Sequence, residues 1–99
     1  MGVELSFGTL KRLERIFSAE DRAVVADLLV NECGENLPGC EGATSTSLER
    51  IRFAVLKVSE GSTSKLLDAL QLAQVDWRDL LVAAGFAEDV TIHSAWWPR

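Results

Sequence analysis

The chain has few residues that interrupt regular structure, since only two of its 99 residues are proline. Most of the backbone is therefore free to form regular elements. No apolar run approaches the length of a membrane span, and no basic N-terminal segment precedes an apolar stretch. We therefore expect a cytoplasmic protein without a secretory signal and without a membrane partner.

Histidine and cysteine are also scarce, which limits the chemistry open to the chain. A histidine base needs a nucleophile or an orienting acid, and the neighbours of His93 match no known triad or elbow spacing. We expect His93 to be partly exposed and to make one hydrogen bond. Cys33, Cys40 and His93 are too few for a zinc site, so no metal, cofactor or catalytic residue is predicted. The cysteines are expected as free thiols, with a disulfide between them as the alternative.

The composition is that of one globular domain spanning residues 1–99, with 47% hydrophobic and 25% charged residues. The net charge is −5, and successive segments of the chain carry local charges of opposite sign. Residues 19–49 carry seven acids and one arginine, whereas residues 50–65 carry four bases and one acid. This alternation suits packing between neighbouring elements better than long-range attraction of nucleic acid.

Nucleic-acid binding is the least favoured function. A helix-turn-helix would begin its recognition helix with Asp76 and Asp79, whose carboxylates would repel phosphates. The alternative is a basic patch formed if the first and third helices are adjacent. Its members would be Lys11, Arg12, Arg15, Arg50, Arg52, Lys57 and Lys65.

Apolar residues recur at helical spacing in successive segments. The pattern predicts an all-α bundle of five helices with an extended C-terminal tail and a loop over residues 34–47. The predicted helices cover residues 9–17, 19–33, 47–60, 63–75 and 77–84. The predicted core consists of Leu10, Leu13, Phe17, Val25, Leu28, Leu29, Ile51, Val55, Val58, Leu66, Leu70, Leu80 and Leu81.

Capping residues mark the predicted helix ends. A serine, threonine or aspartate before each of the last four predicted helices can accept hydrogen bonds from free backbone amides. A glycine followed by an apolar residue indicates a Schellman ending. The predicted N-caps are Ser18, Thr46 with Glu49 as its box partner, Ser62 or Ser64, and Asp76, and the predicted Schellman pair is Gly85 and Phe86.

Four large apolar residues form the candidate interface. Helical spacing places Phe53 and Leu56 near the polar face of the third helix, and Trp96 and Trp97 are adjacent in the tail. A helix that is apolar on two sides is either central in a bundle or in contact with a second chain. We expect Trp77 and one tail tryptophan to pack inward and the other to point outward. Tryptophan and large apolar groups on polar faces are enriched in interfaces. The sequence therefore predicts a non-enzymatic protein-interaction module that binds a protein partner or a second copy of itself as a homodimer.

The alternative is a small ligand-binding or enzymatic domain. In this hypothesis, loop 34–47 and the C-terminal tail cover a pocket between helices, because loops of this length are often functional. Cys33, Cys40 and His93 would supply the chemistry. The hypothesis requires that the fold bring these three residues together.

Overall fold

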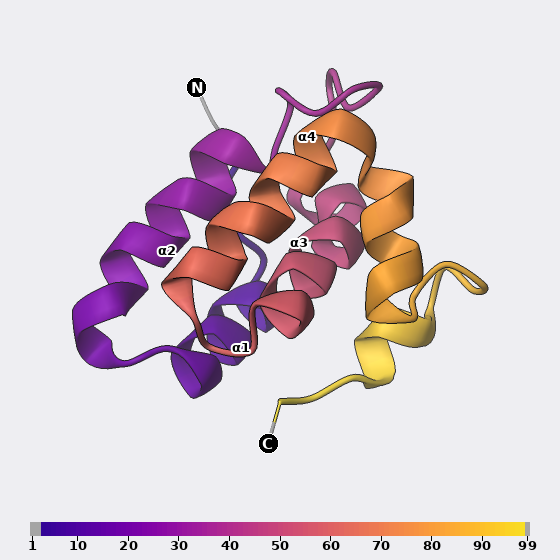
Figure 1. Ribbon diagram of the computed structural model, residues 1–99. Coiled ribbons are helices and arrows are strands. Elements are labelled where there is room, and N and C mark those ends of the chain that lie inside the picture. Colours follow the sequence, from indigo (N-terminus) through magenta and orange to yellow (C-terminus); the bar gives the residue numbers. More distant parts are fainter. Residues whose placement is uncertain (1–2, 99) are drawn as a thin grey trace.

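The computed structural model describes residues 3–98 and shows an all-α fold, as predicted (Figure 1). No helix in this range has the length and apolar character needed to cross a membrane. The elements are the helices α1 (Phe7–Ile16), α2 (Ala19–Glu32), α3 (Ser45–Ser59) and α4 (Thr63–Ala84), followed by the short 3₁₀ helix η1 (Ile92–Ala95).

Helix α4 covers both of the last two predicted helices, so the prediction of five helices is wrong. The backbone of Asp76 is extended, with φ −159° and ψ 98°, and this single residue bends the helix. The Asp76 carboxylate accepts a hydrogen bond from the backbone N–H of Arg78 at 3.0 Å. Asp76 therefore caps the second half of α4 as predicted, but the helix resumes at once and no connecting loop separates the halves.

Helix α3 is the centre of the fold. It contacts α1, α4 and η1, and Figure 1 shows α4 running in front of it with α2 to one side. Because neighbours surround α3, its side chains are buried on more than one face. Phe53 is 1% exposed and Leu56 is 0% exposed. The prediction that these two residues form an interface on the surface is therefore wrong.

Most of the predicted core is buried, but three of its members are not. Leu28 and Val58 are half-buried, and Leu10 is exposed, because α1 turns Thr9 and Leu13 toward its neighbours instead. The predicted core residues that are buried are Leu13, Phe17, Val25, Leu29, Ile51, Val55, Leu66, Leu70, Leu80 and Leu81.

The helix ends agree with the sequence in part. Gly85 adopts φ +79° and Phe86 donates its backbone N–H to the carbonyl of Leu81 at 2.9 Å, which confirms the Schellman ending. Ser62 accepts from the backbone N–H of Lys65, which confirms its capping role. Helix α3, in contrast, is capped by Thr44 with Ser47 as box partner, so the predicted box of Thr46 and Glu49 is wrong. Ser18 precedes α2 as predicted, but its side chain accepts no hydrogen bond from a backbone amide.

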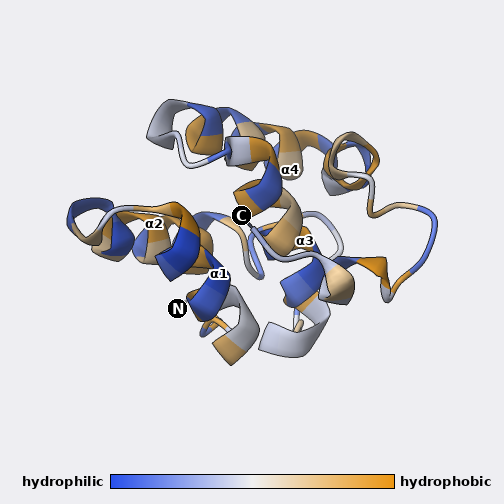
Figure 2. Cartoon of the chain, turned by 90° about the horizontal axis from the view of Figure 1, so that it is seen from below, coloured by the Kyte–Doolittle hydropathy of each residue, from blue (hydrophilic) through white to orange (hydrophobic). Residues whose placement is uncertain are grey.

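The C-terminal tail is not fully extended as predicted, because η1 interrupts it. Asp89 accepts from the backbone N–H of Thr91 at 2.8 Å, and the hydroxyl of Ser94 donates to the carbonyl of Thr91 at 2.7 Å. These local bonds close the short turn. The loop between α4 and η1 includes a hydrophilic stretch (Figure 2). Val90 in this loop and Ile92, the first residue of η1, are both exposed.

Candidate functional site

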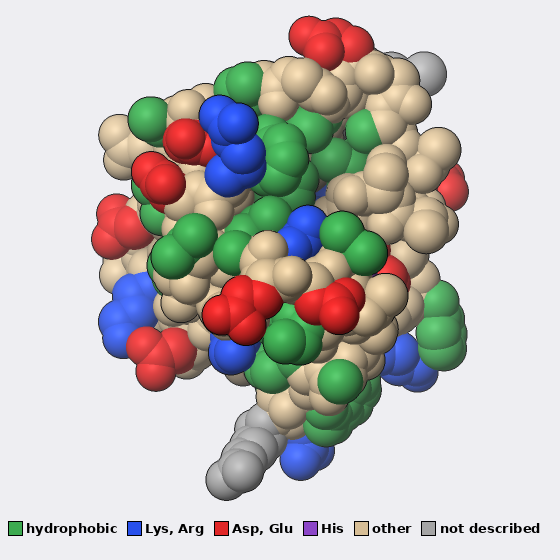
Figure 3. Space-filling model, turned by 90° about the vertical axis from the view of Figure 1, so that its right-hand side faces the viewer, with side chains coloured by type: hydrophobic (Ala, Val, Ile, Leu, Met, Phe, Trp, Pro, Cys, Tyr) green, Lys and Arg blue, Asp and Glu red, His purple; other side chains and the backbone are tan. Residues whose placement is uncertain are grey.

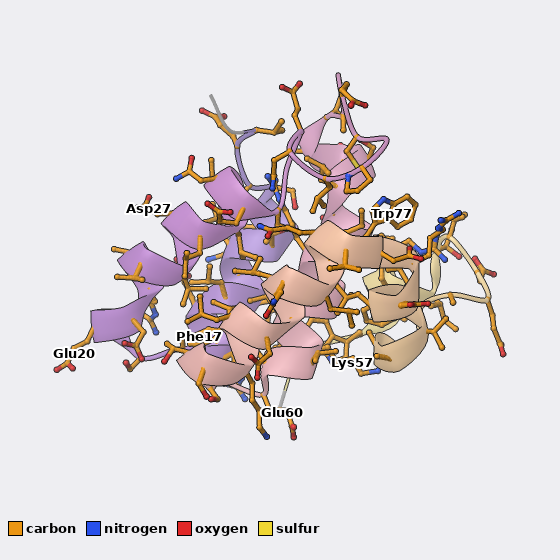
Figure 4. The ribbon with its side chains drawn as sticks, turned by 45° about the horizontal axis from the view of Figure 1, so that its top comes forward. Phe17, Glu20, Asp27, Lys57, Glu60 and Trp77 are labelled. Atoms are coloured by element: carbon orange, nitrogen blue, oxygen red, sulfur yellow. The ribbon has the colours of Figure 1, made fainter. Side chains whose placement is uncertain are left out.

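The segment between α2 and α3, predicted as a loop, is held by its own turns and by α4. The backbone N–H groups of Cys40 and Ala43 donate to the carbonyls of Leu37 and Cys40, each at 3.0 Å. Leu37 is buried. The indole N–H of Trp77 donates to the carbonyl of Pro38 at 2.8 Å, and Figure 4 shows Trp77 beneath this loop. These hydrogen bonds and the buried Leu37 therefore hold the loop against α4.

A cleft of about 360 Å³ lies where this loop meets α3 and the second half of α4. We call it the loop cleft. Figure 3 shows it as a hollow lined by hydrophobic side chains, with basic side chains beside it. Its lining is mostly apolar, and loop glycines form part of the rim. The lining residues are Gly39, Cys40, Glu41, Gly42, Ala43, Ser47, Leu48, Arg50, Ile51, Trp77 and Leu81.

Arg50 is the one base in the lining of the loop cleft. Its Nε and Nη2 both donate to the carbonyl of Phe86, the Nε at 3.1 Å. Among residues 3–98, no carboxylate lies within ion-pair distance of Arg50. The pKa of Asp89 is lowered chiefly by hydrogen bonds from Thr91, and the charge of Arg50 lowers it further by a smaller amount. The cleft therefore combines an apolar floor with a half-buried guanidinium whose charge is not paired.

Sequence reasoning did not place Trp77 or Arg50 at a site. Trp77 was expected in the core and is half-buried, while Arg50 was assigned to a basic patch. A signal for Trp77 exists, because its indole N–H needs an acceptor when buried and a proline-containing loop offers free carbonyls. No local signal marks Arg50, since its partner Phe86 lies 36 residues away.

Both cysteines are buried and free. Burial raises the pKa of the Cys33 thiol to about 12, which Arg52 opposes and Cys40 reinforces. Burial, followed by the charge of Glu41, also raises the pKa of Cys40. Both sulfurs therefore stay protonated near neutral pH and are weak nucleophiles.

His93 is buried, so the expectation of a partly exposed histidine is wrong. Its ring meets Phe53 edge-on, with centroids 5.3 Å apart, and lies 6.3 Å from Phe86. Its Nε2 lies 3.6 Å from a carboxylate oxygen of Glu49, whose other oxygen accepts from the hydroxyl of Ser6 at 2.8 Å. The Nδ1 atom has no hydrogen-bond partner among the described residues.

The structure does not gather Cys33, Cys40 and His93 into one site. His93 is absent from the lining of the loop cleft, and its neighbours are aromatic rings and Glu49. Within residues 3–98, no group of three histidine, cysteine or acidic side chains is arranged to hold a metal ion. The hypothesis of chemistry by these three residues therefore loses its basis.

The two tail tryptophans face different ways, as predicted. Trp96 is half-buried and lies 6.0 Å from Phe53 and 6.1 Å from Phe86 between ring centroids. Trp97 is 51% exposed and has the guanidinium of Arg12 over its ring at 5.0 Å. Trp97 is therefore the only one of the four candidate interface residues that is largely open to solvent.

Several basic side chains donate hydrogen bonds to backbone carbonyls. Lys57 donates to Ala84 O at 2.8 Å, at the end of α4, and Arg52 donates to Cys33 O at 2.9 Å, at the end of α2. Cations are favourable at helix C-termini. The members of the predicted basic patch that are engaged in this way are Arg12, Arg50, Arg52 and Lys57. An open basic patch of the predicted composition is therefore not formed.

Comparison with known proteins gives no relative from which a function could be transferred. No family model matches the chain, and no curated protein or solved structure is significantly similar to it. The loop cleft and the surfaces around it are therefore the basis for inferring a function.

Proposed function

We propose that this chain is a protein-interaction module that receives an apolar side chain of a partner protein in the loop cleft. The observation that carries the proposal is the cleft itself. Leu48, Ile51 and Leu81 form its apolar lining and Trp77 stands at its side. Its volume of about 360 Å³ lies within the usual range for binding pockets. Pockets lined by aromatic and aliphatic groups are where interface anchors bind.

Arg50 adds a polar requirement to this site. Two of its nitrogens are held by Phe86 O, which fixes the orientation of the guanidinium. A carboxylate beside the apolar side chain would pair with this charge. Glu41 also lines the cleft and would repel a second carboxylate. The favoured ligand is therefore a segment with one large apolar side chain and a single acidic group next to it.

Binding is favoured over catalysis because the one thiol in the cleft is a poor nucleophile. Burial raises the pKa of Cys40, whereas reactive cysteines have a lowered pKa. The partner is proposed to be a different protein. The homodimer form relied on Phe53 and Leu56 together with an outward-pointing tail tryptophan, and of these only Trp97 is exposed, whereas Phe53 and Leu56 are buried in the core.

Panning a library of random displayed peptides against the full chain tests the proposal. We expect selected peptides to share a large apolar residue with an acidic neighbour. Filling the cleft by Ala43→Phe should weaken their binding by about tenfold or more. The matched control Ala87→Phe, at an exposed position outside the cleft, should leave binding unchanged. Arg50→Gln should weaken the binding of acidic peptides more than the binding of the same peptides with asparagine or glutamine in place of the acid.

Failure to select any peptide, or equal binding to Ala43→Phe and the wild type, would contradict the proposal. Light scattering on the free chain completes the test. A stable dimer whose formation blocks peptide binding would replace the partner protein with a second copy of the chain.

A further inference from the structure

A second apolar surface lies between α2 and the first half of α4, which run side by side in Figures 1 and 4. Leu28 and Leu67 line a groove of about 230 Å³ between the two helices. Leu67 is 52% exposed, and Val24, one turn before Leu28 on α2, is 57% exposed. We call this surface the α2/α4 groove. It shares no lining residue with the loop cleft.

Acidic side chains flank the α2/α4 groove. Glu32 is part of its lining and accepts from the amide of Gln74 at 2.8 Å. Glu20 and Asp27 project from the outer edge of α2, as Figure 4 shows. On α4, the exposed Asp68 lies one turn before Gln71, a lining residue. Both sides of the groove therefore carry negative charge.

The basic residues of these two segments are directed elsewhere. Arg22 of α2 donates to the carbonyl of Phe17, which follows α1, at 3.1 Å and to the carbonyl of Glu14 in α1 at 2.8 Å. Lys65 of α4 pairs with Glu60 at 3.1 Å. The groove thus combines exposed aliphatic side chains with the acids Glu20, Asp27, Glu32 and Asp68, none of which forms an ion pair with a base of residues 3–98.

We propose that the α2/α4 groove binds a cationic amphipathic helix of a partner protein. Grooves between helices accept a third helix through apolar residues at positions i, i+3 or i+4, and i+7. Helix α2 has 14 residues, so a partner helix of about 14 residues, or about 21 Å, matches its length. Lysine or arginine residues beside the apolar stripe would pair with Glu20, Asp27, Glu32 and Asp68.

The α2/α4 groove does not bind the α2/α4 groove of a second copy of the chain. Pairing two α2/α4 grooves about a twofold axis would bring acidic side chains opposite acidic side chains, and like charges across an interface are unfavourable. This inference is independent of the loop cleft, because the two sites lie on different residues and are tested by different ligands.

The test uses a synthetic peptide of about 14 residues with leucines at helical spacing and lysines elsewhere, and a matched peptide with glutamate in place of lysine. Both are titrated into the isotope-labelled full chain. We expect the lysine peptide to bind and to shift amide signals in α2 and in the first half of α4. We expect the glutamate peptide to bind about tenfold more weakly or worse.

Charge-reversal variants separate the groove from general attraction to an acidic protein. The double variant Asp27→Lys with Asp68→Lys should lose about tenfold in affinity. The control Glu14→Lys with Glu88→Lys changes the net charge equally at exposed positions outside the groove and should bind as the wild type does. Leu67→Gln keeps every charge and should also weaken binding. Circular dichroism confirms that each variant is folded.

Several outcomes would overturn the inference. One is absence of binding, and another is an equal loss of affinity in both double variants. A third is a set of shifts outside α2 and α4. A concentration-dependent increase in mass that Asp27→Lys with Asp68→Lys abolishes would instead assign the groove to a second copy, through the exposed Phe7 and Lys11 of its α1.

Discussion

The Cys33 thiol is enclosed at the end of α2, and burial raises its pKa from the ordinary value of 9.0 to about 12. Between these pH values, an unfolded chain releases a proton that the folded chain retains. The folded state therefore binds more protons than the unfolded state, and stability must fall as the pH rises. The contribution of this thiol is complete below about pH 9 and is lost toward about pH 12.

We predict that the free energy of unfolding falls more steeply with pH in the wild type than in Cys33→Ala, from about pH 9 upward. The difference in slope should approach about 1.4 kcal/mol per pH unit. Urea denaturation at stepped pH measures it. The lysines titrate in both proteins, so their effect cancels in the comparison. Parallel slopes would show that the thiol is not held protonated by the fold.

The burial of a single residue was predicted well where the apolar face of its own helix determines it. It was predicted poorly where contacts with several neighbouring elements determine it. Leu13 and Leu66 lie on simple apolar stripes and are buried as expected. Phe53 and Leu56 lie off the main stripe of α3, which indicates exposure only if one face of the helix is covered. Neighbouring elements on several sides of α3 bury them. An apolar pattern on two sides of a helix fits either a central position in a bundle or contact with a second chain, and the pattern alone does not distinguish the two. His93 was misplaced because its neighbours come from α3 and from the end of α4.

At the scale of elements, two left-handed residues end α3 and α4. Gly85 adopts φ +79° at the end of α4, and a Cβ there would meet only Lys57 Nζ at 3.8 Å. Glu60 adopts φ +52° at the end of α3 although it has a side chain. Glycine at position 85 tolerates the left-handed conformation, whereas glutamate at position 60 is strained by it.

Substitutions at these two positions should therefore change stability in opposite directions. Gly85→Ala is predicted to lower the free energy of unfolding by about 1 kcal/mol, because only the backbone is strained. Glu60→Gly is predicted to raise it by about 0.5–1 kcal/mol, since the exposed pair with Lys65 contributes little. Urea titrations followed by circular dichroism measure both values. If both substitutions changed the free energy of unfolding in the same direction, backbone strain at Glu60 would not be the cause.

Element boundaries were predicted where the local signal is unique. Gly85 and Phe86 offer one Schellman ending, and the chain forms it. At the start of α3, Thr44 with Ser47 and Thr46 with Glu49 are both possible boxes. The structure uses the first pair, and Glu49 instead accepts from Ser6, 43 residues away. Local capping rules do not include hydrogen bonds from residues far away in the sequence, and such a bond engages the Glu49 carboxylate here.

At the scale of the whole molecule, Arg52 joins three segments. It is fully buried and donates to the carbonyls of Cys33, Glu4 and Val3 at 2.9, 2.8 and 2.7 Å. These bonds connect the centre of α3 with the end of α2 and with the segment before α1. Each bond to a charged donor contributes about 1.5–3 kcal/mol.

Arg52→Met keeps much of the side-chain volume but leaves three carbonyls without their donor. We predict a loss of about 3 kcal/mol or more in the free energy of unfolding, measured by urea denaturation. The control Arg78→Met removes an exposed arginine paired only with Asp76 and should change stability by less than about 0.5 kcal/mol. Similar effects in the two variants would show that the buried contacts of Arg52 contribute little.

The fold class could be predicted from helical spacing, but the candidate sites could not. The loop cleft is built from three separate parts of the chain, among them Cys40, Ile51 and Trp77. The α2/α4 groove likewise needs Leu28 beside Leu67. Which helices become neighbours depends on their packing, and one sequence does not encode that in its periodicity.

The tail is fixed by contacts that span nearly the whole chain. Arg12 donates to the carbonyls of Trp96 and Ser94, which are 84 and 82 residues away. Closing such a long loop carries an entropic cost, so we expect the tail to dock after the helices that it contacts have formed. Two of the three tryptophans, Trp96 and Trp97, belong to this segment. The intrinsic fluorescence of the protein therefore follows the docking of the tail more than the formation of the helices, and far-ultraviolet dichroism follows the reverse.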